Sequence, residues 1–133
     1  MSDNIKLIGN VASPYTRKMV AYLRYKRIPY EIIWGQPEDV LKEMKIEAPK
    51  PVLLPVFILD RNGQATAVTD STPLIREFEE KYPGRSVLPK DSALNFINFV
   101  LEDFGDEWCT KFMFHYRWHF DEDADNAGTI LPL

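Results

Sequence analysis

The sequence predicts an α/β domain followed by a segment that is entirely helical. Runs of apolar and β-branched residues alternate with a helical pattern up to about residue 60. A tight turn at residues 60–63 then joins two further apolar runs, as in an antiparallel hairpin. After Pro89, apolar residues recur only at helical spacing. The elements before Pro89 therefore follow the order βαβ and then ββα, which is the topology of a thioredoxin-like domain.

Strands and helices alternate in this first domain. The expected strands are residues 5–9, 30–34, 56–59 and 65–68. The expected helices are residues 15–27, residues 38–45 and a segment that opens near residue 70 and closes at Pro83. In the first helix the apolar residues share one face, so we expect its basic residues, including Lys18 and Lys26, on the solvent-exposed face.

The residues from 90 onward are expected to begin an all-helical domain. Asp91 and Ser92 are suited to cap a helix. The apolar residues that recur at three- and four-residue steps along this helix are Leu94, Ile97, Leu101 and Phe104. We expect Gly105 to end this helix and another helix to occupy residues 106–118. The predicted domains are therefore residues 1–84 and 90–133.

Composition excludes several classes of function. Sixteen Lys and Arg residues against twenty Asp and Glu residues give a net charge of −4, which provides no field to attract nucleic acid. The apolar runs are much shorter than a bilayer requires, so no membrane span is expected. The chain opens without a signal-peptide pattern, and its single cysteine, Cys109, cannot form an internal disulfide. These features predict a cytoplasmic protein without nucleic-acid or membrane partners.

Ser13 and Pro14 directly follow the first expected strand. A serine before a proline is a common helix start, because the hydroxyl accepts a backbone hydrogen bond and proline suits the first helical position. The positive end of a helix dipole also stabilises a bound anion. From these two residues alone, both a capping role and a binding role remain open.

Asp70 and Ser71 open the third expected helix, although Thr72 and Pro73 could instead be its cap and first residue. An acid and a hydroxyl at a helix start also suit a ligand group in which a carboxylate and an ammonium lie side by side. Pro55 stands at the beginning of an apolar run, a position where a strand tolerates proline.

The three pairs Ser13–Pro14, Leu54–Pro55 and Asp70–Ser71, in this order and at these separations, resemble the glutathione-binding half of a cytosolic glutathione transferase. The resemblance implies a thioredoxin-like domain and the first helices of an all-helical domain. It also implies that glutathione is the co-substrate, and it assigns a role to each pair.

Ser13 would donate a hydrogen bond to the glutathione sulfur, with the Tyr15 hydroxyl as the alternative. The backbone of Leu54, held by a cis-Pro55, would pair with the cysteinyl part of glutathione. Asp70 would receive the ammonium group of the γ-glutamyl residue, and Ser71 its carboxylate. Lys50 would reach the glycyl carboxylate, or it is a solvated loop residue.

The resemblance implies an enzyme of detoxification in which the glutathione thiolate attacks a small electrophilic substrate. It also implies a homodimer, for which Phe96 and Phe99 would suit the interface. Only the first two helices of the family's helical domain are expected here, so we expect either a fragment or a shortened member. The alternative function is a non-catalytic module that binds glutathione or a protein partner.

Two further chemistries have weaker support. The loop at residues 10–18 contains no cysteine, which disfavours thiol–disulfide exchange. Such exchange would require Cys109 to be exposed, whereas its aromatic neighbours favour a buried residue. His115 and His119 have the four-residue spacing of metal ligands, but the surrounding aromatic residues favour packing, and we expect no metal.

Overall fold

The computed structural model describes residues 5–131. The chain divides into two compact units, Met1–Arg85 and Ser86–Leu133. The outer ends of the predicted domains, residues 1–4 and 132–133, lie outside the described residues, and the predicted domain boundaries stay predictions.

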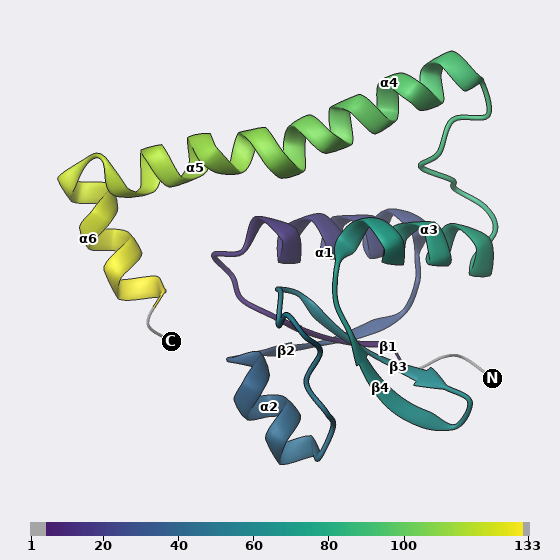
Figure 1. Ribbon diagram of the computed structural model, residues 1–133, viewed down its shortest axis with the longest axis horizontal. Helices are drawn as coiled ribbons and strands as arrows, with labels where there is room; N and C mark the ends of the chain where they lie inside the picture. Colours follow the sequence, from purple (N-terminus) through teal and green to yellow (C-terminus); the bar gives the residue numbers. More distant parts are fainter. Residues whose placement is uncertain (1–4, 132–133) are drawn as a thin grey trace. The chain divides into compact units, whose positions relative to one another are not determined.

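The first unit is a mixed four-stranded sheet with helices on both faces (Figure 1). Its elements are β1 (Ile5–Gly9), α1 (Pro14–Lys26), β2 (Tyr30–Trp34), α2 (Pro37–Met44), β3 (Val56–Arg61), β4 (Gln64–Val68) and α3 (Ser71–Lys81). The strand order is β2-β1-β3-β4, with β1 parallel to β2 and both other pairs antiparallel. This arrangement confirms the predicted α/β, thioredoxin-like fold.

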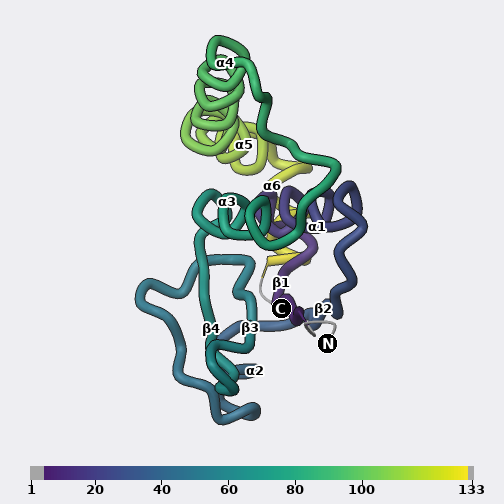
Figure 2. Tube along the Cα trace, turned by 90° about the vertical axis from the view of Figure 1, so that its right-hand side faces the viewer, coloured from purple at the N-terminus to yellow at the C-terminus, as the bar shows by residue number. Residues whose placement is uncertain are grey.

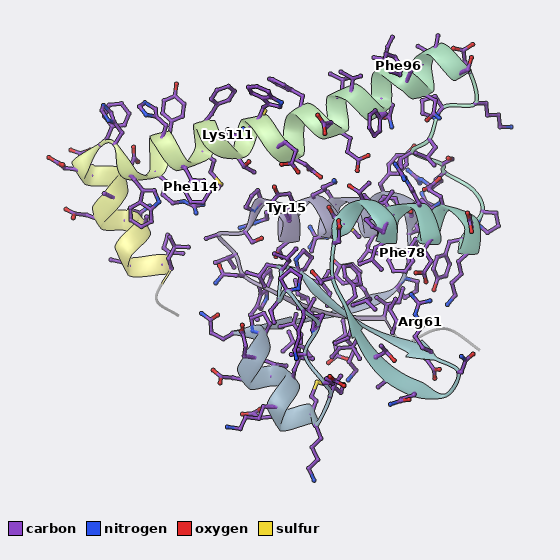
Figure 3. All side chains as sticks on the ribbon, viewed as in Figure 1. Tyr15, Arg61, Phe78, Phe96, Lys111 and Phe114 are labelled. Carbon is purple, nitrogen blue, oxygen red and sulfur yellow. The ribbon has the colours of Figure 1, made fainter. Side chains whose placement is uncertain are left out.

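Helices α1 and α3 lie side by side on one face of the sheet, and α2 lies on the other face (Figure 2). Strands β1 and β3 are central. Strand β1 and the first four residues of β3 are almost completely buried, and Leu7, Val56 and Phe57 have no exposed surface. The ring of Phe78 lies beneath α3, where it meets Phe57 edge to face with ring centroids 5.7 Å apart (Figure 3). On the other face, α2 buries Leu41 against β1 and β3. The hydrophobic effect therefore fixes both layers to the sheet.

The loop between β1 and α1 is held by a close approach of Gly9 to Thr16. A Cβ atom on Gly9 would lie only 2.5 Å from Cγ2 of Thr16, which is fully buried. The Thr16 hydroxyl also accepts a hydrogen bond from the backbone N–H of Asn10, at 3.4 Å. Only glycine lets the end of β1 pass this close to the first turn of α1.

The second unit begins with a long, continuous helical stretch (Figure 1). Its elements are α4 (Ser92–Asp103), a π-helical turn η1 (Phe104–Trp108), α5 (Cys109–Trp118) and α6 (Asp121–Ile130). Asp91 caps α4 by accepting a hydrogen bond from the N–H of Leu94 at 2.9 Å, as predicted. The expected break at Gly105 is wrong, because the chain accommodates this glycine within the π turn and continues as a helix.

The apolar residues that recur along α4 are exposed. Leu94, Ile97, Leu101 and Phe104 are between 47% and 63% exposed. Phe96 and Phe114 are also exposed and project from α4 and α5 (Figure 3). Ala127 is the one buried hydrophobic residue among the described residues of the unit. Cys109, predicted to be buried, is only half-buried. Helical periodicity identified the apolar stripe but could not show whether another element covers it.

The substitution Gly9→Ala is expected to lower the free energy of unfolding by about 1–3 kcal/mol, because its methyl group would overlap a buried side chain. The double variant Gly9→Ala with Thr16→Ser removes Cγ2, the nearest atom, and should recover part of the loss. Urea unfolding monitored by circular dichroism measures both. A Gly9→Ala variant as stable as the unmodified chain would contradict the proposed close approach.

Candidate functional site

The pairing of β1 with β3 brings two of the predicted site segments together. Ile8, near the end of β1, lies opposite Val56, the first residue of β3. The loop from β1 to Ser13 therefore leaves the sheet next to the point where Leu54 and Pro55 enter it. The peptide bond between Leu54 and Pro55 is cis, as the resemblance implied.

The pairing of β3 with β4 adds the third segment. Phe57 lies opposite Val68, so the end of β4 is next to the start of β3. The Thr69 hydroxyl donates a hydrogen bond to the backbone oxygen of Leu53, at 3.0 Å, and ties the two segments together. Asp70 follows directly. The loops that carry Ser13, Leu54–Pro55 and Asp70–Ser71 thus leave or enter the sheet at the same edge.

Three of the hydrogen bonds between α1 and α3 occur in the same order along both helices. They are Lys18 Nζ to Ser71 Oγ (3.2 Å), Tyr22 OH to the Ile75 oxygen (3.4 Å) and Lys26 Nζ to the Tyr82 oxygen (2.7 Å). The two helices are therefore parallel, with their N-termini at the same end. Since each N-terminus carries a partial positive charge, this end of the unit is suited to bind an anion.

Ser13 is the N-cap of α1. Its backbone is extended, with φ −82° and ψ 119°, and its Oγ accepts a hydrogen bond from the N–H of Thr16 at 3.2 Å. This capping bond uses an oxygen lone pair, so the hydroxyl hydrogen can still be donated to a ligand. Capping and ligand binding are thus compatible roles for the same hydroxyl. Tyr15, the alternative hydroxyl, is half-buried in the first turn of α1 (Figure 3).

Asp70 is the N-cap of α3, so the alternative start at Thr72 and Pro73 is not used. Its Oδ1 accepts a hydrogen bond from the N–H of Thr72, at 3.3 Å. Its backbone has φ 79° and ψ 115°, a region in which a side chain is strained. Such strain costs about 1–3 kcal/mol and is concentrated at ligand sites. Asp70 is exposed, whereas Ser71, the first residue of α3, is only 7% exposed.

The loop between α2 and β3 contains Lys50 and Leu54. Leu54 is half-buried and Pro55 is buried. Lys50 is exposed, and its bond to Pro51 is also cis, which nothing in the sequence predicted. The predicted roles of Lys50 and Leu54 stay predictions.

Sequence reasoning missed a buried polar cluster between α1 and α3. Lys26, expected on the solvent-exposed face, is only 8% exposed and forms an ion pair with Glu79 at 2.9 Å. The Tyr22 hydroxyl donates to the same Glu79 oxygen at 2.9 Å. Burial, and then the hydrogen bond to Glu79, raise the pKa of Tyr22 well above its usual value. Because the polar atoms satisfy one another, the cluster is stable although it is buried.

A signal for this cluster is present in the sequence. Lys18, Tyr22 and Lys26 follow one another at four-residue steps, which places them on one stripe of α1. On α3, Ser71, Ile75 and Glu79 have the same spacing. The spacing shows that each set lies on one stripe of its helix, but it does not show that the two stripes meet or in which direction the helices run. The hydrogen bonds and the ion pair in the structure show both.

Two other predictions concern residues away from this site. Among residues 5–131, no group of three or more His, Cys, Asp and Glu residues is arranged to hold a metal ion. The rings of His115 and His119 stack on each other, with centroids 4.6 Å apart, within a cluster of aromatic residues. None of the helices in the described part of the chain has both the length and the apolar character needed to cross a bilayer.

The first unit belongs to the class of thioredoxin-like folds, and the N-termini of its two parallel helices lie at one edge of the sheet. Comparison with known sequences identifies the family within this class. The family model for the N-terminal domain of glutathione S-transferases matches residues 7–86, which is more than half of the chain. The chain therefore belongs to the glutathione S-transferase family.

Two curated relatives match this chain over a similar number of residues. Glutathione S-transferase U6 of Arabidopsis thaliana is 27% identical over 90 residues, and a probable glutathione S-transferase of Nicotiana tabacum is 30% identical over 87 residues. The two matches cover 68% and 65% of this chain but only 39% and 37% of the relatives, so the chain spans about two fifths of their length. A glutathione S-transferase structure from Methylobacterium radiotolerans, in complex with glutathione sulfonate, has the same fold. It matches with a TM-score of 0.70 and 24% identity over 90% of this chain and 55% of that chain.

Removing one partner of the buried ion pair between Lys26 and Glu79 should lower the free energy of unfolding. Lys26→Met leaves the Glu79 carboxylate buried without this counter-charge, and we expect a loss of about 3–5 kcal/mol in unfolding free energy. Adding Glu79→Gln removes the charge but keeps an oxygen for Tyr22, and should recover at least half of the loss. Lys42→Met, at an exposed position of α2, is the control and should change stability by less than about 0.5 kcal/mol. Urea unfolding measures all three, and equal stability of both Lys variants would contradict the buried pair.

Proposed function

We propose that this chain binds glutathione at the edge formed by Ser13, Leu54–Pro55 and Asp70–Ser71, and activates its thiol for attack on a small electrophile. The observation that carries the proposal is the convergence of two helix N-termini with the cis-Pro55 segment at one edge of the sheet. The names of the relatives support the same activity. The structure from Methylobacterium radiotolerans was determined with a glutathione derivative, which supports the ligand class.

The sulfur would lie at the N-terminus of α1. There the Ser13 hydroxyl donates to it, and the positive end of the helix dipole favours the thiolate over the thiol. A free thiol has a pKa of about 8.5, and lowering it by about one unit, or about 1.4 kcal/mol, multiplies the thiolate fraction at neutral pH several-fold. Ser13 acts as a hydrogen-bond donor, and the attacking atom is the glutathione sulfur.

The rest of glutathione would extend across the other two segments. The backbone N–H and C=O of Leu54 pair with the cysteinyl residue in the manner of a short added strand. The Asp70 carboxylate receives the γ-glutamyl ammonium, while Ser71 and the N–H groups of α3 receive the neighbouring carboxylate. Lys50, on the exposed loop, is proposed for the glycyl carboxylate.

In the reaction, the bound thiol first loses its proton to water. The thiolate then forms a sulfur–carbon bond with the electrophile. If the electrophile carries a halogen at this carbon, the carbon–halogen bond breaks and its electron pair leaves with the halide. A homodimer, a cytoplasmic location and a role in detoxification remain predictions that accompany this activity.

The second candidate is a module that binds glutathione or a protein partner without turnover. It is favoured by the exposure of the second unit, whose helices bury only Ala127 among the described hydrophobic residues. An electrophile site needs apolar walls, and exposed helices do not form a closed pocket by themselves. Glutathione binding without conjugation would support this candidate.

Conjugation of glutathione to chlorodinitrobenzene, measured by absorbance, tests the role of the Ser13 hydroxyl. Ser13→Gly removes the hydroxyl but costs the helix cap only a few tenths of a kcal/mol, so kcat/KM should fall by about tenfold or more. Ser13→Thr keeps both the hydroxyl and the cap and should retain most of the rate. If the Gly variant turns over as fast as the unmodified chain, Ser13 is only a cap.

A further inference from the structure

The second unit carries most of the large apolar side chains that are exposed to solvent. Among residues 5–131, eighteen large hydrophobic residues are exposed, and thirteen of them lie between positions 94 and 120. A soluble monomer rarely exposes a contiguous apolar patch larger than roughly a few hundred Å², and a larger patch commonly marks an interaction surface. The proposed glutathione site uses none of these thirteen residues.

Six of the exposed residues follow one another along one face of the helical stretch from α4 to α5 (Figure 1). In an α-helix each four-residue step advances about 40° around the axis, so repeated steps would carry the side chains away from this face. The π turn η1 takes more residues per turn and reverses part of this advance. These six residues form the α4–α5 stripe, which is Leu94, Ile97, Leu101, Phe104, Trp108 and Phe112.

The unit that carries the α4–α5 stripe is strongly acidic. Residues 86–133 contain three Lys and Arg residues and nine Asp and Glu residues, a net charge of −6 in a chain whose total is −4. Asp103 and Glu107, which directly precede Phe104 and Trp108, are exposed. A helix with its side chains is about 10–12 Å across, which is close to the Debye length of about 8 Å at physiological salt, so this charge acts on any partner that lies on the stripe. The field attracts a basic partner and repels the same unit of a second copy.

The aromatic residues of the stripe are also suited to a basic partner. The Nζ of Lys111 already lies over the Trp108 ring, 4.6 Å from its centroid (Figure 3). An arginine guanidinium stacks on aromatic faces more often than a lysine ammonium does, and tryptophan and arginine are enriched among the residues that dominate binding energy at protein interfaces. The stripe therefore offers aliphatic side chains for apolar packing and ring faces for guanidinium groups.

We infer that the α4–α5 stripe docks an amphipathic helix of a protein partner, with apolar residues at helical spacing and arginine or lysine residues beside them. The eighteen steps from Leu94 to Phe112 span about 27 Å, so a helix of about 18 residues matches the length of the stripe. Its apolar face packs on the stripe, and its basic residues contact the ring faces and the acidic surroundings. This inference goes beyond the proposed glutathione site, because every residue that it uses belongs to the second unit.

The experiment measures the binding of three labelled 18-residue peptides to the full chain by fluorescence anisotropy. The first peptide has leucine at helical spacing and arginine elsewhere, the second has glutamate in place of every arginine, and the third has glutamine in place of every leucine. The first should bind at least about tenfold more tightly than either of the others, because they lack the charge or the apolar face. Its affinity should fall when the salt concentration is raised.

Ile97 and Phe99 provide a matched pair of variants. They are 52% and 51% exposed on the same helix, but two positions apart they point about 160° away from each other. Ile97→Ser should weaken the arginine peptide by about fivefold or more, whereas Phe99→Ser, which removes a larger apolar side chain, should stay within about twofold. Asp103→Asn combined with Glu107→Gln should weaken the arginine peptide and reduce its salt dependence. Circular dichroism verifies that every variant keeps its helices.

Two results of the peptide titrations would overturn the inference. Equal affinity of the chain for the arginine and glutamate peptides would refute a basic partner. Equal weakening by Ile97→Ser and Phe99→Ser would refute the α4–α5 stripe as the docking surface.

Sedimentation velocity of the chain alone tests the other possible occupant, a second copy. The inference predicts that Ile97→Ser leaves the oligomeric state unchanged. A dimer that Ile97→Ser dissociates would make the stripe an interface between copies and would refute docking of a basic helix.

Discussion

Parallel packing of α1 against α3 is the constraint on which the candidate site depends. Two parallel helix dipoles side by side repel each other, so the arrangement needs specific contacts to hold it. The ion pair between Lys26 and Glu79 supplies one at the C-terminal ends, and the bond between Lys18 and Ser71 supplies another at the N-terminal ends. These contacts determine that both positive ends emerge at the edge where β3 begins.

One unusual backbone conformation of the first unit lies at that edge. The backbone of Asp70 is strained, and the half-buried Lys18 lies against Ser71, the first residue of α3. The opposite end of the helix pair, in contrast, has its buried charges paired and its tyrosine hydroxyl hydrogen-bonded. A fold tolerates local strain where the surrounding structure is well determined, and such places are commonly ligand sites. The strain at Asp70, outside the usual left-handed region, therefore agrees with a binding site at this edge.

The fold was predictable because its signals are local. Alternating strand and helix patterns identified the elements of the first unit, and their boundaries differ from the structure by a residue or two, as with α1, which begins at Pro14 rather than Tyr15. The caps Ser13 and Asp91 were predicted from residue type alone. Asp70 was also identified, but only the backbone angles show its strain.

The remaining features depend on long-range packing that no local pattern contains. Lys18 and Lys26 were placed in solvent because the apolar residues of the first helix share the other face, and only their partners on α3 show why they are not exposed. Gly105 was expected to end a helix because its propensity is low, but the π turn accommodates it. Periodicity identified the apolar stripe of α4, but it could not show that the stripe is exposed, because it cannot identify a covering element.

The most direct test of the account is a two-dimensional nitrogen–proton NMR titration of the isotope-labelled chain with glutathione sulfonate. If glutathione binds at the N-termini of α1 and α3, the largest chemical-shift changes will occur at the backbone amides of Ser13, Leu54 and Ser71, with little change along α2. Changes centred on α2 or on the second unit, with these three amides unmoved, would contradict a ligand site built on the N-termini of α1 and α3.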